Sequence, residues 1–255
     1  MTDAAEPRRI THAEMLKLKR WNTPTIYNGW EQITSRDSAR ECFNREEVRD
    51  FMPQMGVMVG RAVTVVVQAS DARHRKEHPE NWTNYVRYVA SVPAPKIVVV
   101  QDLDKPDCHG ALWGEVCANT HRALGCVGTI TDGPIRDVDE MANAGLKAIA
   151  RRLCIGHGHI WPLRWNCDVE VFGTRISPGQ LIHADKHGFL AIPAQDEAGL
   201  LDAAVFMDNN ECNTVIPAAR GTVGLTTEEA LRRIAEAAAA HGKATRERFR
   251  AKGAW

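Results

Sequence analysis

The chain has 255 residues, of which 44% are hydrophobic and 25% are charged; this is the composition of a folded globular protein and excludes disorder as its main state. Its 32 basic and 32 acidic residues cancel at pH 7, so there is no global positive field to attract nucleic acid or an anionic membrane surface. No apolar run approaches the ~20 residues that span a bilayer, and residues 1–9 are too polar for a signal peptide. Seven cysteines, without a Cys-x-x-Cys pair, argue against a disulfide framework or a structural zinc site and favour a cytoplasmic protein.

The first fifty residues predict short helices. Thr11 and Glu14 have the spacing of a capping box, and Asn22 followed by Pro24 is typical of a second helix start. We therefore expect residues 1–54 to form an N-terminal helical extension.

Strands and helices are then expected to alternate. Two β-branched runs predict strands at 62–67 and 96–100, separated by a charged loop at 74–81 and a helix at 82–90. The next expected elements are a helix at 110–124, a strand at 127–131, a turn at 132–134, a helix at 136–143 and a strand at 146–153. This alternation predicts an α/β fold.

The last third of the chain predicts strands between residues 167 and 193, with turns at 178–179 and at Gly188. Two helices are expected at 197–208 and 227–240. We expect the main domain to cover 55–212 and a C-terminal helical extension to cover 213–255, in which the charged run 246–252 forms a solvated helix face.

One stretch carries residues suited to chemistry. Glu115 lies at one predicted helix start and Arg136-Asp137 lie at the next, and the turn and strand between them should bring both helix N-termini to one edge of the sheet. Backbone N–H groups at a helix N-terminus attract an anion such as a carboxylate. Two acids and a base at that edge could hold a divalent metal and a carboxylate together. The alternative is a surface ion pair whose Asp merely favours the helix dipole.

Four ordered motifs resemble the RraA-like family, which contains the class II 4-hydroxy-4-methyl-2-oxoglutarate / 4-carboxy-4-hydroxy-2-oxoadipate aldolases. The likeness runs from about residue 55 to 212. The motifs are Gly60–Val65, the segment Gly114–Asp137 with its acidic residue, twenty residues and Arg-Asp, Ser177–Gln180 and Ala184–Gly188. The resemblance implies that residues 55–212 form a catalytic domain, a swivelling ββα sandwich similar to phosphohistidine domains. It also implies homotrimers or homohexamers with active sites between subunits.

The resemblance implies roles for individual residues. Asp137 would be the metal ligand, and Glu115 would orient the metal-bound waters and assist catalysis. Arg136 would bind the 2-oxo acid end of the substrate and steady the enolate that forms.

The substrate carboxylate would be held at the helix N-terminus after Gly114, by the backbone N–H groups of Val116 and Cys117. The family also uses a glutamate from the neighbouring subunit, and Glu211 matches its place in the sequence. Glu211 or a metal-bound water would take the proton from the 4-hydroxyl group.

The implied activity is that of a divalent-metal-dependent lyase. Retro-aldol cleavage of a 4-hydroxy-2-oxo di- or tricarboxylic acid would release pyruvate, and oxaloacetate decarboxylation would pass through the same enolate. Hard oxygen ligands favour Mg²⁺ or Mn²⁺ over zinc. The expected partners are a small 2-oxo acid and further copies of the chain, without nucleic acid or membrane.

The segment with His157 and His159 departs from the aldolase pattern. The two histidines would line the substrate site, or they are solvent-facing residues packed on tryptophans. A metal-dependent hydratase or decarboxylase acting on another 2-oxo acid therefore stays open. The resemblance also leaves open a regulator that binds an RNA-degrading endonuclease, as some family members do.

Other polar residues have simpler explanations. His183, close to a predicted turn, is expected to be exposed. The acidic loop with Asp102 and Asp104 is expected to be solvated, and Cys117 to pack as a small apolar side chain.

Overall fold

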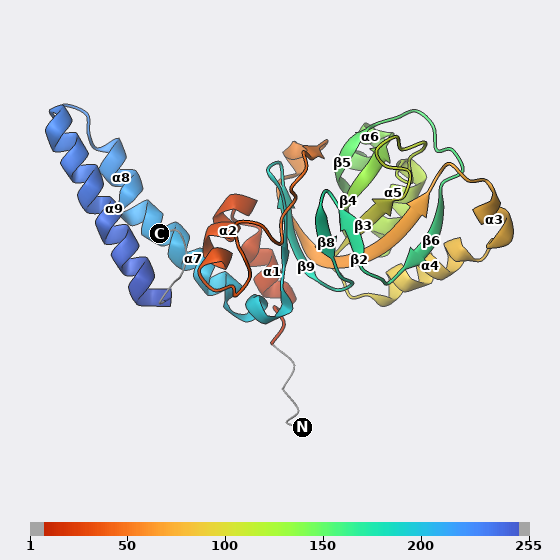
Figure 1. Cartoon of the computed structure of the whole chain (residues 1–255), viewed down its shortest axis with the longest axis horizontal. Helices are drawn as coiled ribbons and strands as arrows, with labels where there is room; N and C mark the ends of the chain where they lie inside the picture. Colours follow the sequence, from red (N-terminus) through yellow and green to blue (C-terminus); the bar gives the residue numbers. More distant parts are fainter. Residues whose placement is uncertain (1–7, 250–255) are drawn as a thin grey trace, which may run out of the picture.

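A mixed β-sheet runs through the larger part of the molecule (Figure 1). The structure is a computed structural model that describes residues 8–249. The sheet consists of β1 (Arg49–Asp50), β2 (Met58–Gln68), β3 (Lys96–Asp102), β4 (Cys126–Ile135), β5 (Lys147–Leu153), β6 (Trp161–Trp165), β9 (Leu181–Asp185) and β10 (Gly188–Ile192). Its order is β1-β5-β4-β3-β2-β9-β10, and β6 pairs with the second half of β2. The strands β2, β3, β4 and β5 are parallel to their neighbours in this group, so their carboxyl ends lie at one edge.

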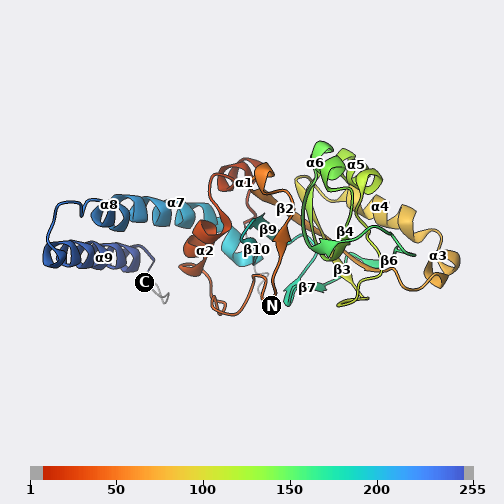
Figure 2. The ribbon, with the colours of Figure 1, turned by 90° about the horizontal axis from the view of Figure 1, so that it is seen from above.

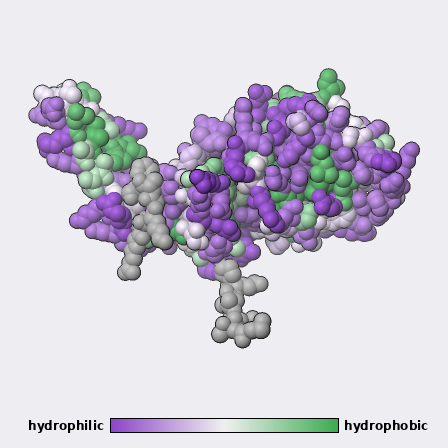
Figure 3. Space-filling view, viewed as in Figure 1, coloured by the Kyte–Doolittle hydropathy of each residue, from purple (hydrophilic) through white to green (hydrophobic). Residues whose placement is uncertain are grey.

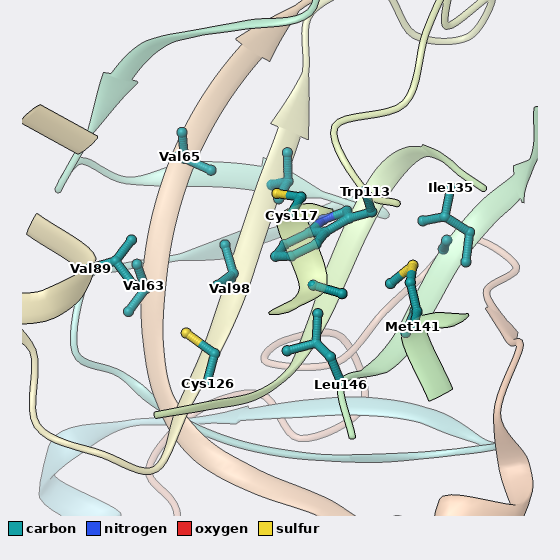
Figure 4. Close-up of a cluster of buried hydrophobic side chains, with 14 of the residues drawn as sticks. Val63, Val65, Val89, Val98, Trp113, Cys117, Cys126, Ile135, Met141 and Leu146 are labelled. Atoms are coloured by element: carbon teal, nitrogen blue, oxygen red, sulfur yellow. The ribbon is translucent and has the colours of Figure 1, made fainter. Parts of the chain in front are cut away.

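Helices cover one face of this sheet. They are α4 (Asn81–Ser91), α5 (Glu115–Ala123) and α6 (Val138–Asn143), whereas α3 (Arg73–Glu77) contacts β6 and has no buried residue. Because successive side chains of a strand point to opposite faces, Val63 and Val65 of β2 pack beneath the helices. Figure 4 shows these valines in one cluster with Trp113, Cys117 and Met141.

A hairpin of β7 (Val169–Val171) and β8 (Thr174–Ile176) covers the opposite face. Its apolar side chains pack against Ala62 and Val66 of β2. Both faces of β2 are therefore buried, which is why its sequence reads as a continuous apolar run rather than an alternating one.

A third apolar layer joins the first two helices to residues far along the chain. It contains α1 (His12–Leu18), α2 (Thr23–Glu31) and the start of α7 (Glu197–Asn213), packed on β9 and β10. A Cβ at Gly29 of α2 would lie 2.6 Å from the backbone nitrogen of Ala204, so only glycine allows α2 and α7 to approach this closely.

Buried polar groups hold this layer together. The carboxylate of Glu197 is fully buried and accepts hydrogen bonds from Arg61 at 2.5 and 2.8 Å, from Arg9 at 2.8 Å and from the Ile10 N–H at 3.1 Å. His183 is also buried, with Nδ1 3.0 Å from Thr23 Oγ1, and the expectation that it is exposed is wrong.

The chain then leaves this layer as a helical arm, which we define as the outer half of α7 together with α8 (Val215–Arg220) and α9 (Thr227–Phe249). Figures 1 and 2 show the arm projecting away from the sheet, with α9 running back beside α7 and α8. Apolar side chains gather on the arm surface (Figure 3), and exposed examples are Val223, Leu225, Leu231 and Ile234.

The α/β alternation and the helical segments at both ends are as predicted, but several boundaries differ. Residues 74–81 contain α3 and are not entirely a loop. The helix expected at 110–124 begins only at Glu115, and the one expected at 136–143 begins at Val138. Residues 132–134 continue β4 and form no turn, α8 was missed, and α7 and α9 are longer than predicted.

Two 3-10 turns, Pro53–Met55 and Ala194–Asp196, complete the described elements. The domain limits at 54 and 212 stay a prediction. Residues 1–7 and 250–255, including the end of the charged run 246–252, lie outside the described residues. Within residues 8–249, every helix is too short or too polar to cross a membrane.

Candidate active site

The carboxyl end of β4 meets the N-termini of α5 and α6 at one edge of the sheet, and three predicted site residues lie there (Figure 1). Arg136 follows Ile135, the last residue of β4, and its N–H donates to the Trp113 carbonyl at 3.1 Å. Asp137 precedes α6 in the left-handed conformation, with φ 55° and ψ 49°. The N–H of Glu115, the first residue of α5, donates to Asp137 Oδ2 at 3.1 Å. One carboxylate thus connects the two helix N-termini.

Gly114 makes this contact possible. A Cβ at this position would lie 2.6 Å from Asp137 Oδ2 and 3.2 Å from Arg136 Nε. Gly114 is in the extended conformation, so glycine is needed here for space and not for its backbone freedom. The family resemblance predicts Gly114 beside the substrate carboxylate, and the structure places it against both charged side chains.

The Arg136 side chain lies between Asp137 and the segment after β5. Its Nε is 3.7 Å from Asp137 Oδ2, and its Nη1 donates to the Ile155 carbonyl at 3.3 Å. The side chains of Arg136 and Asp137 are 38% and 33% exposed, so both groups are fixed by neighbours yet open to a ligand from solvent.

The N-terminus of α5 offers backbone donors beside these charges. The N–H groups of Val116 and Cys117 belong to its first turn, where a helix provides no backbone acceptor. The positive end of the helix dipole points the same way and favours an anion. The Cys117 thiol is buried 3.5 Å from His121 Nδ1, and burial raises its pKa well above the ordinary value, which agrees with a packing role.

The donor set fits a hydrated divalent cation. Among residues 8–249, no three His, Cys, Asp or Glu side chains form a metal-binding group. Mg²⁺ usually keeps several bound waters and binds through one or two carboxylates, so it needs fewer protein ligands than a site built from three side chains. Asp137, fixed through the Glu115 N–H, and the exposed carboxylate of Glu115 itself are the residues that would hold it.

His157 and His159 line a surface hollow next to α3. Both are exposed and line a hollow of about 650 Å³ together with Arg75 and Lys76; Glu115, Arg136 and Asp137 are not among its lining residues. The segment reaches Arg136 through the Ile155 carbonyl instead. The role of both histidines in substrate binding stays a prediction.

Glu211 also lies away from the candidate site of its own chain. It belongs to α7 in the helical arm, and its Oε1 accepts a hydrogen bond from Asn28 Nδ2 at 3.0 Å. Figures 1 and 2 show the arm and the α5–α6 edge at opposite ends of the molecule. A role for Glu211 in catalysis therefore requires another copy of the chain.

A buried acid pair joins β3 and β4, and it was not predicted. Asp102 is buried, its N–H donates to Asp132 Oδ1 at 2.7 Å, and Lys105 Nζ lies 3.0 Å from Asp132 Oδ2. Burial raises the pKa of Asp102 to about 6 and also raises the pKa of Asp132. The expectation that Asp102 is solvated is wrong. The pair joins the ends of β3 and β4 and so supports the residues that lead to Arg136.

A family model described as RraA-like, Aldolase/RraA, matches residues 23–191. The chain belongs to the RraA-like family. Its matched region includes both segments that form the candidate site, Gly114–Asp137 and the residues after β5. The recognition made from the sequence motifs is therefore confirmed.

Two curated relatives differ in length from this RraA-like chain. Protein DlpA of Legionella pneumophila is 27% identical over 121 residues, which are 47% of this chain and 19% of that protein. A Halalkalibacterium halodurans protein named "Putative 4-hydroxy-4-methyl-2-oxoglutarate aldolase" is 31% identical over 117 residues, 44% of this chain and 53% of that protein. The chain thus matches about a fifth of the first relative and about half of the second.

Solved structures establish the fold of this RraA-like chain. An uncharacterized protein from Pseudomonas syringae pv. tomato matches with a TM-score of 0.67 at 22% identity, over 91% of this chain and 99% of the other. Streptomyces coelicolor RraAS2, described as an unusual member of the RNase ES inhibitor RraA protein family, matches with a TM-score of 0.63 at 17% identity, over 80% and 96%. The predicted ββα sandwich with helical extensions is confirmed.

Proposed function

We propose that the chain is a divalent-metal-dependent carbon–carbon lyase that cleaves a 4-hydroxy-2-oxo di- or tricarboxylic acid and releases pyruvate. The observation that carries the proposal is the shared position of Asp137, Arg136 and the N-terminus of α5, joined by the 3.1 Å hydrogen bond from the Glu115 N–H. The aldolase name of a family relative supports the reaction class. The substrate is a small molecule.

In this mechanism the chain binds the 2-oxo acid end of the substrate. The N–H groups of Val116 and Cys117 hold its carboxylate at the positive end of α5. The positively charged guanidinium of Arg136 approaches the 2-oxo oxygen, where negative charge develops as the C3–C4 bond breaks. A divalent ion held by Asp137 and Glu115, Mg²⁺ or Mn²⁺, would supply Lewis-acid stabilisation of the same charge.

The 4-hydroxyl proton must leave as the carbon–carbon bond breaks. We propose that Glu211 of a neighbouring copy accepts it, because Glu211 lies on a projecting arm and not near the site of its own chain. This requires a homo-oligomer, a trimer or a hexamer, with active sites between subunits. Oxaloacetate would lose carbon dioxide at the same site, since the same pyruvate enolate forms.

The test measures pyruvate with lactate dehydrogenase after adding 4-hydroxy-4-methyl-2-oxoglutarate or oxaloacetate in the presence of Mg²⁺. We expect pyruvate release that stops in EDTA and returns with Mg²⁺ or Mn²⁺. Asp137→Asn should abolish turnover, whereas Asp139→Asn, an exposed acid on the same helix, should leave it unchanged. Full activity in EDTA, or in the Asp137 variant, contradicts the mechanism.

A second candidate is a regulator that binds an RNA-degrading endonuclease. It is motivated by the RNase ES inhibitor description of one structural relative and by the exposed apolar side chains of the helical arm, such as Leu231 and Ile234. Tight binding of an endonuclease without any metal-dependent turnover would favour it.

A third candidate keeps the metal and changes the reaction to hydration or decarboxylation of another 2-oxo acid. It is motivated by the His157–His159 segment, which departs from the aldolase pattern. A panel of 2-oxo acids separates it from the lyase, since only the lyase releases pyruvate from a 4-hydroxy-2-oxo acid.

A further inference from the structure

An arginine-rich cavity of about 610 Å³ lies on the side of the sheet that carries the β7–β8 hairpin. Three segments far apart in the sequence form it: the N-terminal residues up to 45, the hairpin with the residues around it, and residues 193–195. Its lining includes five arginines, which are Arg9, Arg36, Arg40, Arg45 and Arg175. None of the residues of the candidate active site lines it.

The positive charge of this cavity is only partly neutralised. Only two acids line it, Glu41 and Asp168, against five arginines; the acids that contact Arg40 and Arg9, Asp37 and Glu197, are not among its lining residues. Asp168 pairs with Arg175, and Glu41 lies 3.4 Å from Arg36. Gathering like charges in one cavity costs free energy that a bound anion would recover.

The remaining arginines have weak or shared partners. Arg40 lies 3.8 Å from Asp37, at the long end of ion-pair distances, and its side chain is 83% exposed. Arg9 contacts Glu197, a carboxylate that also accepts hydrogen bonds from Arg61. The guanidinium groups of Arg40 and Arg9 therefore still offer N–H donors to a ligand.

The cavity wall is held by the backbone as well as by side chains. The Arg45 N–H donates to the Phe172 carbonyl at 2.9 Å, and its Nε donates to the Gly173 carbonyl at 2.7 Å. Thr174 Oγ1 donates to the Phe43 carbonyl. These bonds join the N-terminal segment to the β7–β8 hairpin and fix one guanidinium in the wall before any ligand arrives.

We propose that this cavity binds a compact small-molecule polyanion. Guanidinium groups bind phosphate and carboxylate oxygens with the same paired N–H geometry, so a pyrophosphate or triphosphate group and a tricarboxylate share the required chemistry. The volume lies within the range of small-ligand sites. Among residues 8–249, no aromatic side chain lines the cavity, so these residues do not provide the base stacking that single-stranded nucleic acid would use.

The test is calorimetric titration of the full chain at 150 mM salt with three probes: tripolyphosphate, citrate and a single-stranded RNA oligomer. We expect saturable binding of tripolyphosphate or citrate, and the tighter of the two identifies the anion source. The Arg36→Gln/Arg40→Gln variant should bind at least tenfold more weakly. Both side chains are largely exposed, so the variant should fold, which its melting temperature verifies.

The matched control removes two positive charges elsewhere. Arg232→Gln/Lys243→Gln on α9 breaks two exposed ion pairs outside the cavity and should change the affinity less than twofold. The proposal is overturned if neither small anion binds saturably, if only the RNA oligomer binds, or if both double variants behave alike. Because the readout is binding, this outcome is independent of lyase activity.

Discussion

The backbone N–H of Glu115 and the side chain of Asp137 are joined by a 3.1 Å hydrogen bond across 22 positions of the sequence. The bond fixes the carboxylate that we propose as the metal ligand at the N-terminus of the helix that we propose as the carboxylate-binding site. Metal, arginine and anion-binding backbone would therefore act on one end of one substrate.

The contact predicts that Gly114→Ala damages the site without unfolding the chain. The added methyl group would lie 2.6 Å from Asp137 Oδ2 and must displace that carboxylate or the helix start. A displacement of ~1 Å costs roughly 100-fold in rate, so we expect kcat/KM for pyruvate release to fall by about that factor. The control is Gly156→Ala, because a Cβ there meets no atom within 4 Å. Equal activity of the two variants would contradict the prediction.

A site between subunits predicts complementation. Glu211→Gln and Asp137→Asn should each be inactive alone, since every site would lack either its proton acceptor or its metal ligand. Subunits unfolded and refolded together at equal amounts should recover about a quarter of the wild-type activity, because that share of sites receives both intact residues. Each variant refolded alone is the control. Activity of Glu211→Gln alone would place Glu211 outside the active site, and absence of recovery in the mixture would show that the two residues do not act from different subunits. Asp208→Asn, on the same helix, should retain activity throughout.

The buried histidine His183 predicts acid sensitivity. Burial lowers its pKa to about 4. In the unfolded chain the pKa of this histidine is near 6.5, so between pH 6.5 and pH 4 the unfolded state binds more protons than the folded state. The stability that the neutral, buried His183 contributes is therefore present above pH 6.5 and is lost as the pH falls toward 4. Because His183 takes up a proton on unfolding, it should lower the free energy of unfolding by about 2 kcal/mol when the pH falls from 7 to 5.

The measurement is urea unfolding at pH 7 and pH 5 of the wild type, of His183→Gln and of the exposed control His12→Gln. The difference between the two pH values should shrink in His183→Gln and stay as in the wild type in His12→Gln. Because Asp102, whose pKa is raised to about 6, acts in the opposite direction, the comparison must be made between variants and not on the wild type alone. An unchanged difference in His183→Gln would show that His183 does not titrate on unfolding.

The buried carboxylate of Glu197 predicts a large loss of stability. Glu197→Gln leaves Arg61, whose guanidinium it contacts at 2.5 and 2.8 Å, without its opposite charge in a nearly buried position. Breaking such a pair costs about 3–5 kcal/mol, measured as unfolding free energy in urea. The matched change Glu236→Gln, in the exposed pair with Arg232, should cost at most about 0.5 kcal/mol. A small effect at Glu197 would mean that the pair contributes little net stability.

The proximity of Glu115, Arg136 and Asp137 was predictable, because it follows from the parallel order of strands and helices. The direct contact through Gly114 was not, since a glycine at a helix start carries no local signal of the carboxylate it will touch. The burial of Asp102 was not predictable either. An acidic loop reads as solvated, and only the register of β3 against β4 brings Asp102 to Asp132.

The misplaced elements have a common cause. Asp132, Gly133 and Pro134 carry strong turn preferences, yet pairing with β5 resumes at Pro134 after a register shift, so the sheet overrides them. The place of His157 and His159 likewise depends on how their segment packs on Ala69, where the His159 N–H donates to the carbonyl at 2.9 Å. Long-range contacts of this kind leave no periodic pattern in the sequence.

The buried ion pair at Glu197 also has a mechanical consequence, because Glu197 is the first residue of α7. The first residue of α7 is held by the Arg61 guanidinium of β2, and the helix packs closely on α2 at Gly29. The helix α7 therefore has little freedom to pivot. The orientation of the helical arm is therefore fixed in the free subunit, before any partner binds. A partner that binds the helical arm therefore contacts a rigid surface, and the arm loses little conformational entropy on association.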